Sequence, residues 1–312
     1  MDPQIDARRV EAFLNSLFNG AAIDVAVLGE GAWSKAFAFQ IGEDALVARF
    51  GAYREDFEKD EYAMNFASGD LPVPRILEIG DAFGGYFAIS ERHSGHFLEN
   101  LDGEGFERLS PQLLRLFDAM REVRVDQTAS AQWPARPGQE LSWRQWLAAS
   151  VVDDDGPRVG GWRIEMAQSV EIDELFEEGA RVMRGLLAHC PSELHLIHGD
   201  LLNRNALVSG DAMRFEAVFD WGCSAYGDFL YDVAWLTFWT PWHEGLKQLD
   251  TRSLFRTHLR DQGVAVPHFD DRLACYELQI GLTHLAYNTV IRNEEERREV
   301  ANRTKEVLAK MK

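Results

Sequence analysis

The amino-acid sequence predicts an α+β fold with two lobes, a small N-terminal lobe with an antiparallel sheet and one helix, and a larger, mostly helical C-terminal lobe. Three observations support this prediction. The chain has 312 residues, which is more than one hydrophobic core usually holds. Short apolar runs separated by glycine dominate the first ninety residues, whereas the periodicity after residue 91 is helical.

The predicted N-terminal elements follow one another closely along the chain. Residues 25–42, "VAVLGEGAWSKAFAFQIG", have the pattern of strand, glycine turn and strand, and residues 45–52, "ALVARFGA", add a short third strand. Residues 54–68, "REDFEKDEYAMNFAS", have helical spacing, and residues 86–92, "YFAISER", form a further strand. Residues 1–18 have the pattern of an amphipathic helix rather than a secretion signal.

The C-terminal part is predicted to contain longer helices. Residues 109–123, "LSPQLLRLFDAMREV", place Ser110 as a cap and Pro111 in the first helical turn. Residues 141–152 and 170–190 are the next periodic segments. This order of elements resembles a kinase-like plan.

The predicted boundaries follow from where the pattern changes. We expect an N-terminal lobe over residues 1–91, a hinge connector over 92–95, and a C-terminal helical lobe over 96–312. In a kinase-like plan, the first lobe would bind a nucleotide, and the last would carry the catalytic and substrate-binding residues.

Composition restricts the classes of partner. The 32 basic residues against 51 acidic ones give a formal charge of −19, which argues against nucleic-acid backbones and favours cationic small molecules. No apolar run approaches the roughly 20 residues of a membrane span, so we expect a cytoplasmic protein without membrane contact. The three cysteines have neither disulfide nor zinc spacing. We expect a monomer.

Two polar clusters lie inside apolar brackets. Residues 196–208, "LIHGDLLNRNALV", read as a loop between two short strands, with the polar side chains presented rather than buried, and residues 217–221, "AVFDW", end the next hairpin strand. Phosphoryl transfer needs an acceptor hydroxyl held in line and negative charge neutralised by Mg²⁺. Asp200 could accept the hydroxyl proton, and Asn205 and Asp220 could supply oxygen ligands to the metal.

The pair "HGDLLNRN" and "FDW" resembles the catalytic loop and metal segment of the aminoglycoside phosphotransferases, which are relatives of protein kinases. Further stretches, "FASGDLPVPRILEIGD", "AISERHSG", "SWRQWL", "YGDFLYDVAWLTFWTPW" and "LQIGL", extend the resemblance over most of the chain, in particular to the hygromycin B phosphotransferases. The resemblance implies ATP and Mg²⁺ as cofactors and, as acceptor, a hydroxyl of a small cationic molecule such as hygromycin B. It implies the family's roles for His198, Asp200, Asn205 and Asp220.

The expected nucleotide site departs from the family pattern. The turn "LGEGAWSKAF" offers Gly29, Gly31 and Ser34 but no third glycine, and the following strand carries Arg49 where the family has lysine. Arginine keeps the charge and can hold phosphate oxygens through two donors. Asp60 lies on the apolar face of the following helix and is the expected partner of Arg49. By resemblance, main-chain groups around Glu91 and His93 bind the purine edge.

The acceptor site is predicted from aromatic residues. Pro241 should end a helix and leave Trp239 and Trp242 at a cleft edge, where their rings could cover a sugar face. Asp232, near the start of that helix, is expected to brace the loop of Asp200 through main-chain donors. The acids that could bind substrate ammonium groups are Asp153, Asp154, Asp155, Asp271 and Glu277.

Other functions stay open at this point. One is a metabolic kinase for an amino alcohol or a sugar, and another is a nucleotide-binding module without turnover. The intact trio of Asp200, Asn205 and Asp220 argues against the second, because a degenerate module does not need all three. A metal-dependent hydrolase is disfavoured because the sequence lacks clustered histidines.

Overall fold

The computed structural model describes residues 5–133, 140–154, 156 and 158–311, and these fall into two compact units. We call them the sheet unit and the helical unit. The sheet unit consists of Met1–Leu101, Arg108–Ala119 and Asn203–Ser224, and the helical unit consists of Asp102–Glu107, Met120–Leu202 and Ala225–Lys312. Each unit is therefore assembled from three separate stretches of the chain.

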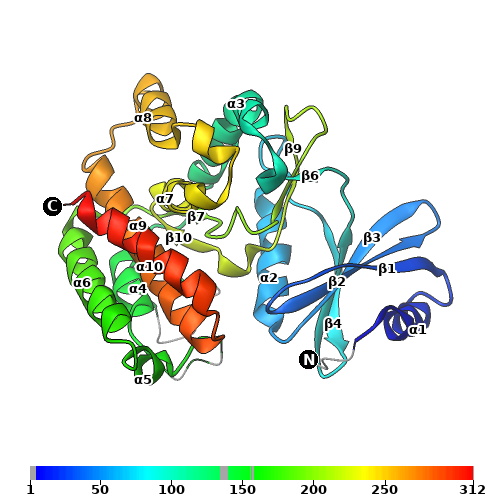
Figure 1. Ribbon diagram of the computed structural model, residues 1–312. Coiled ribbons are helices and arrows are strands. Elements are labelled where there is room, and N and C mark those ends of the chain that lie inside the picture. The colour runs from blue at the N-terminus through cyan, green and yellow to red at the C-terminus, as the bar shows by residue number, and fades with distance from the viewer. Residues whose placement is uncertain (1–4, 134–139, 155, 157, 312) are drawn as a thin grey trace. The chain divides into compact units, whose positions relative to one another are not determined.

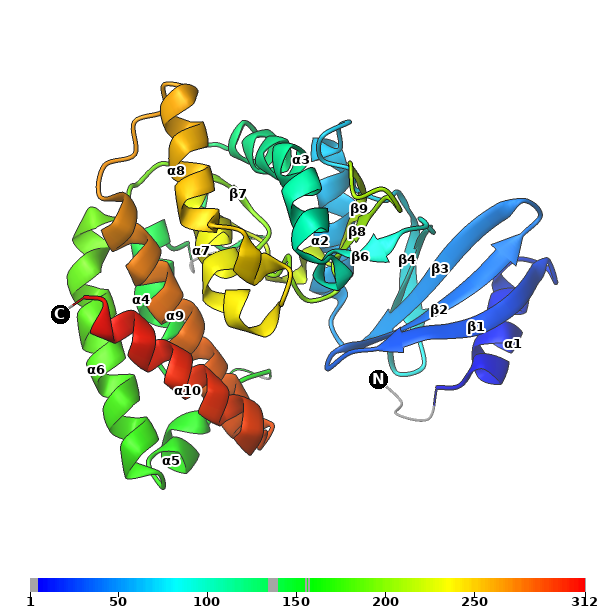
Figure 2. The same ribbon diagram turned by 45° about the horizontal axis from the view of Figure 1, so that its top comes forward.

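A five-stranded antiparallel sheet is the centre of the sheet unit. Its strands are β1 (Ala22–Glu30), β2 (Ser34–Ile41), β3 (Asp44–Gly51), β4 (Ile76–Ala82) and β5 (Gly85–Glu91), in the spatial order β1-β2-β3-β5-β4. Helix α1 (Ala7–Leu17) is capped by Asp6, whose carboxylate accepts the Arg9 backbone N–H at 2.8 Å. The helix lies beside β1 in Figures 1 and 2. Aromatic side chains of α1, β3 and β5 pack together between the helix and the sheet, where the centre of the Phe13 ring lies 5.8 Å from that of Phe50 and 5.0 Å from that of Phe87.

Helix α2 (Arg54–Ala63) follows β3 and continues as the 3₁₀ turn η1 (Met64–Phe66). Its buried face consists of Phe57, Asp60 and Ala63, which share one side at helical spacing. The helix packs against β4, β5 and the 3₁₀ turn η4 (Trp221–Cys223). The predicted helix and its apolar face are confirmed.

A second, small sheet completes the sheet unit. Strand β6 (His96–Phe97) pairs with β8 (Ala206–Val208), which forms an antiparallel hairpin with β9 (Phe215–Val218). The approach of residue 95 to this sheet requires glycine, because a Cβ at Gly95 would lie 2.7 Å from the Val208 carbonyl oxygen. The predicted hairpin before Asp220 is confirmed.

The helical unit is built around α9 (Phe269–Val290), which is buried along most of its length. Helices α6 (Val170–Leu186), α7 (Leu230–Trp239) and α10 (Glu294–Ala309) pack on it, as Figures 1 and 2 show.

The remaining elements of the chain are η2 (Leu98–Asn100), α3 (Gly103–Arg121), α4 (Trp143–Ser150), α5 (Trp162–Met166), η3 (Leu187–His189), β7 (His195–Ile197), β10 (Ala225–Gly227), η5 (Thr240–Trp242), η6 (Leu246–Gln248) and α8 (Thr251–Asp261), with β7 paired to β10. No helix in the described ranges is both long and apolar enough to cross a bilayer.

The start of α3 differs from the prediction. The helix begins at Gly103, and the Asp102 carboxylate accepts the Gly105 backbone N–H at 2.7 Å, so Asp102 caps the helix. Ser110 and Pro111 lie inside the helix. Pro111 is exposed there, and its ring costs the helix one backbone hydrogen bond. The sequence prediction of a cap at Ser110 is therefore wrong by about two turns.

Candidate active site

The two predicted metal ligands lie at the same end of the β8–β9 hairpin. Ala206 pairs with Val218, and the Asn205 carbonyl accepts the Phe219 backbone N–H at 2.9 Å. Asn205 is buried, whereas the Asp220 carboxylate is half-exposed. Amide and carboxylate oxygens are the donors that Mg²⁺ prefers in proteins, so this end of the hairpin fits that ion.

The backbone of Asp220 is left-handed, with φ 62° and ψ 62°. Most L-residues disfavour this conformation, whereas asparagine and aspartate tolerate it, so aspartate suits this position. Contacts of the neighbouring residues hold the segment as well. The next residue provides one of these contacts, because the Trp221 N–H donates to Asp60 Oδ1 at 2.7 Å and the Trp221 ring is fully buried.

Arg49 lies in the middle of β3, between Ala36 of β2 and Ala88 of β5. Its guanidinium donates to Asp60 Oδ2, lies 5.0 Å from the centre of the Phe57 ring, and has Nη1 3.4 Å from Asp220 Oδ2. The predicted pairing of Arg49 with Asp60 is present. Asp60 also binds the backbone next to Asp220, so one buried carboxylate connects the Arg49 guanidinium to the segment that carries Asp220.

Lys59, which the sequence did not single out, lies beside Asp60 in α2 and binds the backbone of the same segment, residues 221–224. Its ammonium group donates to the Gly222 carbonyl at 2.9 Å and to the Ser224 carbonyl at 3.0 Å. Helix α2 therefore fixes residues 221–224 through a carboxylate at Asp60 and a cation at Lys59.

Replacing Lys59 with methionine should weaken nucleotide binding without removing any proposed ligand. Methionine keeps the length of the side chain but leaves two carbonyls without their charged donor, which costs on the order of 1–3 kcal/mol. We expect a lower melting temperature and a higher KM for ATP. The matched control is Arg54→Met on the same helix, where Arg54 forms an exposed pair with Glu58 and lies 5.9 Å from the centre of the Tyr86 ring. Equal effects of the two substitutions would show that Lys59 does not position the segment.

The other predicted nucleotide residues lie at the ends of strands. The Gly31 N–H donates to the Ser34 carbonyl at 2.8 Å and closes the turn between β1 and β2. Glu91 ends β5; its backbone N–H donates to the Arg75 carbonyl at 3.0 Å, and its carboxylate pairs with the Arg75 side chain. His93 follows, and its buried Nε2 finds no hydrogen-bond partner among the described residues.

Glu99 is a second residue that sequence reasoning missed. Its Oε1 accepts the backbone N–H of Arg204, which is left-handed with φ 60° and precedes the predicted ligand Asn205. Burial raises the pKa of the Glu99 carboxyl. The guanidinium of Arg204 lies 4.5 Å from the centre of the Phe97 ring. No local pattern connects Glu99 to a loop more than one hundred residues later, so no sequence signal could have identified it.

In the helical unit, Asp232 braces the loop that carries Asp200. Its carboxylate oxygens accept the backbone N–H groups of His198 and Gly199, both at 2.8 Å. The Asp200 N–H donates to His198 Nδ1 at 3.3 Å, and Asp200 itself is partly exposed. The predicted bracing contact is present. The expectation that the polar side chains of this loop are presented is wrong for His198 and Asn205, which are both buried. His198 accepts the Asp200 N–H within the loop, and Asn205 adjoins the buried start of β8.

The stability that Asp232 contributes should depend on pH. Burial raises the pKa of its carboxyl from 3.8 to about 6, while the two backbone N–H groups act in the opposite direction. The folded chain therefore binds this proton more tightly than the unfolded chain, so the contribution is fully present below pH 3.8 and is lost as the pH rises to about 6.

The variant Asp232→Asn is the reference for this prediction, because its amide side chain does not titrate. The free energy of unfolding of the parent relative to the variant should fall by on the order of 3 kcal/mol between about pH 4 and about pH 7. Urea unfolding of both proteins across this range measures the difference. A difference that stays constant with pH would refute the raised pKa.

Trp239 and Trp242 belong to an aromatic cluster at the end of α7. The Trp239 ring lies 4.9 Å from Trp242 and 4.8 Å from His284, between ring centres. Burial lowers the pKa of His284 to about 4, so that ring is neutral near pH 7. Trp242 Nε1 donates to Glu299 at 2.8 Å, and both tryptophans are half-buried. Part of each tryptophan ring is thus accessible to solvent, and part packs against the other rings of the cluster.

The acids suggested for substrate ammonium groups have different environments. Glu277 is buried and engaged by Thr237 at 2.6 Å and by Arg252 at 2.5 Å, so it is not free to bind an ammonium group. Asp153 accepts the backbone N–H groups at the start of α5. Asp154 accepts the Gly156 N–H at 2.8 Å, Asp271 lies beside two histidines, and Asp155 lies outside the described residues.

Comparison with known proteins finds relatives over most of the chain. The sequence profile of the phosphotransferase enzyme family matches residues 24–277. The chain is 32% identical over 296 residues to Hygromycin-B 4-O-kinase from Escherichia coli, a match that covers 92% of this chain and 81% of that protein.

Solved structures give the same result at the level of the fold. Aminoglycoside phosphotransferase APH(4)-Ia is similar with a TM-score of 0.82 at 28% identity, over 97% of this chain and 99% of that chain. A thermostable mutant of it, in a ternary complex with AMP-PNP and hygromycin B, has a TM-score of 0.80 at 28% identity over 96% and 98%. Spectinomycin phosphotransferase APH(9)-Ia, with a TM-score of 0.59 at 13% identity over 97% and 94%, shares the fold alone. The predicted kinase-like α+β fold is confirmed.

Proposed function

The chain belongs to the phosphotransferase enzyme family and is an ATP-dependent kinase of hydroxyl groups, and we propose that its acceptor is an aminoglycoside, with hygromycin B as the first candidate. The observation that supports this acceptor most strongly is the 32% identity to a hygromycin B kinase across 92% of the chain. The formal charge of −19 is consistent with a cationic acceptor.

The proposed roles in the sheet unit concern the nucleotide. Asn205 and Asp220 would hold Mg²⁺, which when bound neutralises phosphate charge. Arg49 would bind phosphate oxygens while Asp60 fixes its guanidinium, as their contact supports. We assign the turn with Gly31 and Ser34 to the phosphates, and the main chain around Glu91 and His93 to the purine.

The proposed roles in the helical unit concern the acceptor. Asp200 would accept a hydrogen bond from the reacting hydroxyl and take its proton as the new P–O bond forms. Its backbone is held through His198 and Asp232, so the carboxylate is positioned before the acceptor arrives. Trp239 and Trp242 would cover an apolar sugar face with the accessible parts of their rings.

An acceptor panel tests the proposal directly. The purified protein is incubated with ATP, Mg²⁺ and aminoglycosides, amino alcohols or sugars one at a time, and ADP release is followed together with the mass of the acceptor. We expect hygromycin B to accelerate ADP release and to gain the mass of one phosphoryl group. NMR of the product would show whether the 4-hydroxyl carries it, as the name of the relative suggests.

Other outcomes of the panel discriminate the alternatives. Acceleration by an amino alcohol or a sugar without acceleration by hygromycin B would support a metabolic kinase. ATP binding without transfer to any acceptor would support a nucleotide-binding module. A cytoplasmic location, where ATP and Mg²⁺ are abundant, and a monomeric state are part of the proposal, and light scattering of the purified protein tests the latter.

Replacing Trp239 with alanine should raise the KM of the acceptor by about tenfold and change the KM of ATP much less. The accessible part of the ring would be lost from the acceptor site, whereas nothing in the nucleotide site changes. Trp239→Phe is the control for packing, because it preserves an aromatic ring beside His284. Equal increases in both KM values would indicate that Trp239 acts only in packing.

A further inference from the structure

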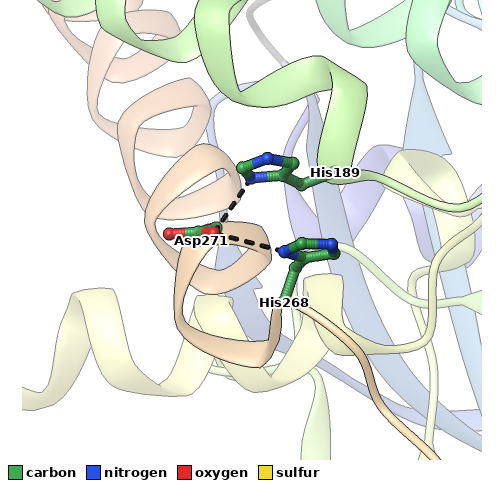
Figure 3. A group of neighbouring side chains, drawn as sticks. All are labelled: His189, His268 and Asp271. Atoms are coloured by element: carbon green, nitrogen blue, oxygen red, sulfur yellow. Dashed lines mark ion pairs between the residues drawn. The ribbon is translucent and has the colours of Figure 1, made fainter.

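Three side chains of the helical unit bring metal-binding atoms together outside the proposed active site. His189 ends the 3₁₀ turn η3, His268 is the residue before α9, and Asp271 lies in the first turn of α9 (Figure 3). One ligand atom from each lies within 4.8 Å of both others. The two histidines are 79 positions apart in the sequence, so the cluster exists only in the folded chain.

In this cluster, the Nδ1 atoms of both imidazoles lie near the same carboxylate oxygen. Asp271 Oδ2 is 2.9 Å from His189 Nδ1 and 3.5 Å from His268 Nδ1, and the two rings stack with centres 4.2 Å apart and planes 7° from parallel. The His189 Nδ1 is buried and makes no hydrogen bond of acceptable angle with a described residue. Its short distance to Asp271 therefore reflects proximity without a directed hydrogen bond.

The backbone that carries these side chains is well anchored. The Cys190 carbonyl, next to His189, accepts a 2.8 Å hydrogen bond from Arg144 Nε. Arg272, next to Asp271, donates to both oxygens of the buried Asp228 carboxylate at 2.7 Å and 2.6 Å. The turn η3 also packs against α9. The His268 carbonyl accepts the Arg272 backbone N–H at 2.9 Å, so the fold sets the backbone positions of all three residues.

We propose that His189, His268 and Asp271 form a binding site for a transition-metal ion of the Zn²⁺ class. Two imidazole nitrogens and one carboxylate oxygen are a ligand set that such ions accept, with water in the remaining position. Mg²⁺ prefers oxygen ligands alone, so this site and the proposed Asn205–Asp220 site select different ions.

Binding requires one local adjustment. The lone pair of an imidazole nitrogen lies in the plane of its ring, so two parallel stacked rings cannot both aim at one ion. The His268 side chain is 52% exposed, and its ring has room to rotate toward a shared ion. The bound ion would connect η3 to the start of α9 and thereby stabilise the folded helical unit.

Zinc binding to the whole, metal-free protein tests this proposal without nucleotide or acceptor. Calorimetric titration with Zn²⁺ and the melting temperature in its presence are compared for the parent, His268→Gln and Asp271→Asn. All proteins carry Cys223→Ser, because Cys223 is an exposed thiol that could bind zinc by itself. The matched control is His258→Gln, a partly exposed histidine of α8 outside the cluster.

We expect the parent and the His258 variant to bind one Zn²⁺ and to melt at a higher temperature in its presence. The two cluster variants should bind at least about tenfold more weakly. Co²⁺ should give a visible absorption spectrum that disappears in these variants, and Mg²⁺ should not compete. Zinc binding of equal strength in all four proteins, or no binding to the parent, would overturn the proposal. If one cluster variant does not fold, the other decides.

Discussion

Asp200→Asn is expected to lower the rate of phosphoryl transfer by at least about a hundredfold, while the affinity for ATP stays nearly unchanged. Asparagine has the same shape, but its amide cannot take the proton of the acceptor hydroxyl. The metal ligands proposed for the nucleotide, Asn205 and Asp220, are untouched. The Asp200 N–H, which donates to His198, also survives, so the loop should retain its conformation.

Steady-state kinetics with saturating acceptor and a nucleotide-binding titration measure the two quantities separately. Asp261→Asn is a suitable control, because Asp261 is an exposed carboxylate of the same unit and its ion pair among the described residues is with its neighbour Arg260. A turnover number for Asp200→Asn within about twofold of the parent would exclude Asp200 as the base.

The second large effect is expected for Asp220→Ala, which should abolish the stabilisation that Mg²⁺ and ATP together confer on the parent. The substitution removes a proposed metal ligand. It also places alanine in a left-handed backbone, which costs about 1 kcal/mol or more. Asp220→Asn separates the two effects, because asparagine tolerates that conformation and keeps one oxygen.

Thermal unfolding with ATP, with and without Mg²⁺, provides the measurement. The parent should show a Mg²⁺-dependent increase in melting temperature, Asp220→Asn a smaller increase and Asp220→Ala none. An increase in the alanine variant as large as that of the parent would show that Asp220 does not bind the metal.

Local patterns predicted the parts of the site that depend on neighbouring residues. The hairpin that carries Asn205 and Asp220 was predicted because short apolar runs adjoin its polar ends, and pairing of strands joined by a short loop is a local event. The contact between Arg49 and Asp60 was predicted because the face of α2 follows from helical spacing.

The contacts that the sequence could not predict join segments far apart in the chain. Lys59 binds carbonyls at residues 222 and 224, and Glu99 binds the backbone of Arg204. Main-chain acceptors and donors have no residue-specific signature, so these two residues look like ordinary surface charges in the sequence. The helix α3 starts about two turns before the predicted cap, because Pro111, which favours a first helical turn, lies exposed inside this helix at the cost of one hydrogen bond. The division into lobes at residues 92–95 stays a prediction.

The discontinuous composition of the sheet unit has a consequence for synthesis on the ribosome. All five strands of the large sheet have been translated by residue 91, but β8, β9 and the backbone partners of Asp60 and Lys59 follow only between residues 206 and 224. Translation adds roughly 5–20 residues per second, so for several seconds the nascent chain contains β6 without its partner β8, and α2 without its contacts to residues 221–224. Truncated nascent chains should therefore become protease-resistant in this unit only after Ser224 has left the exit tunnel.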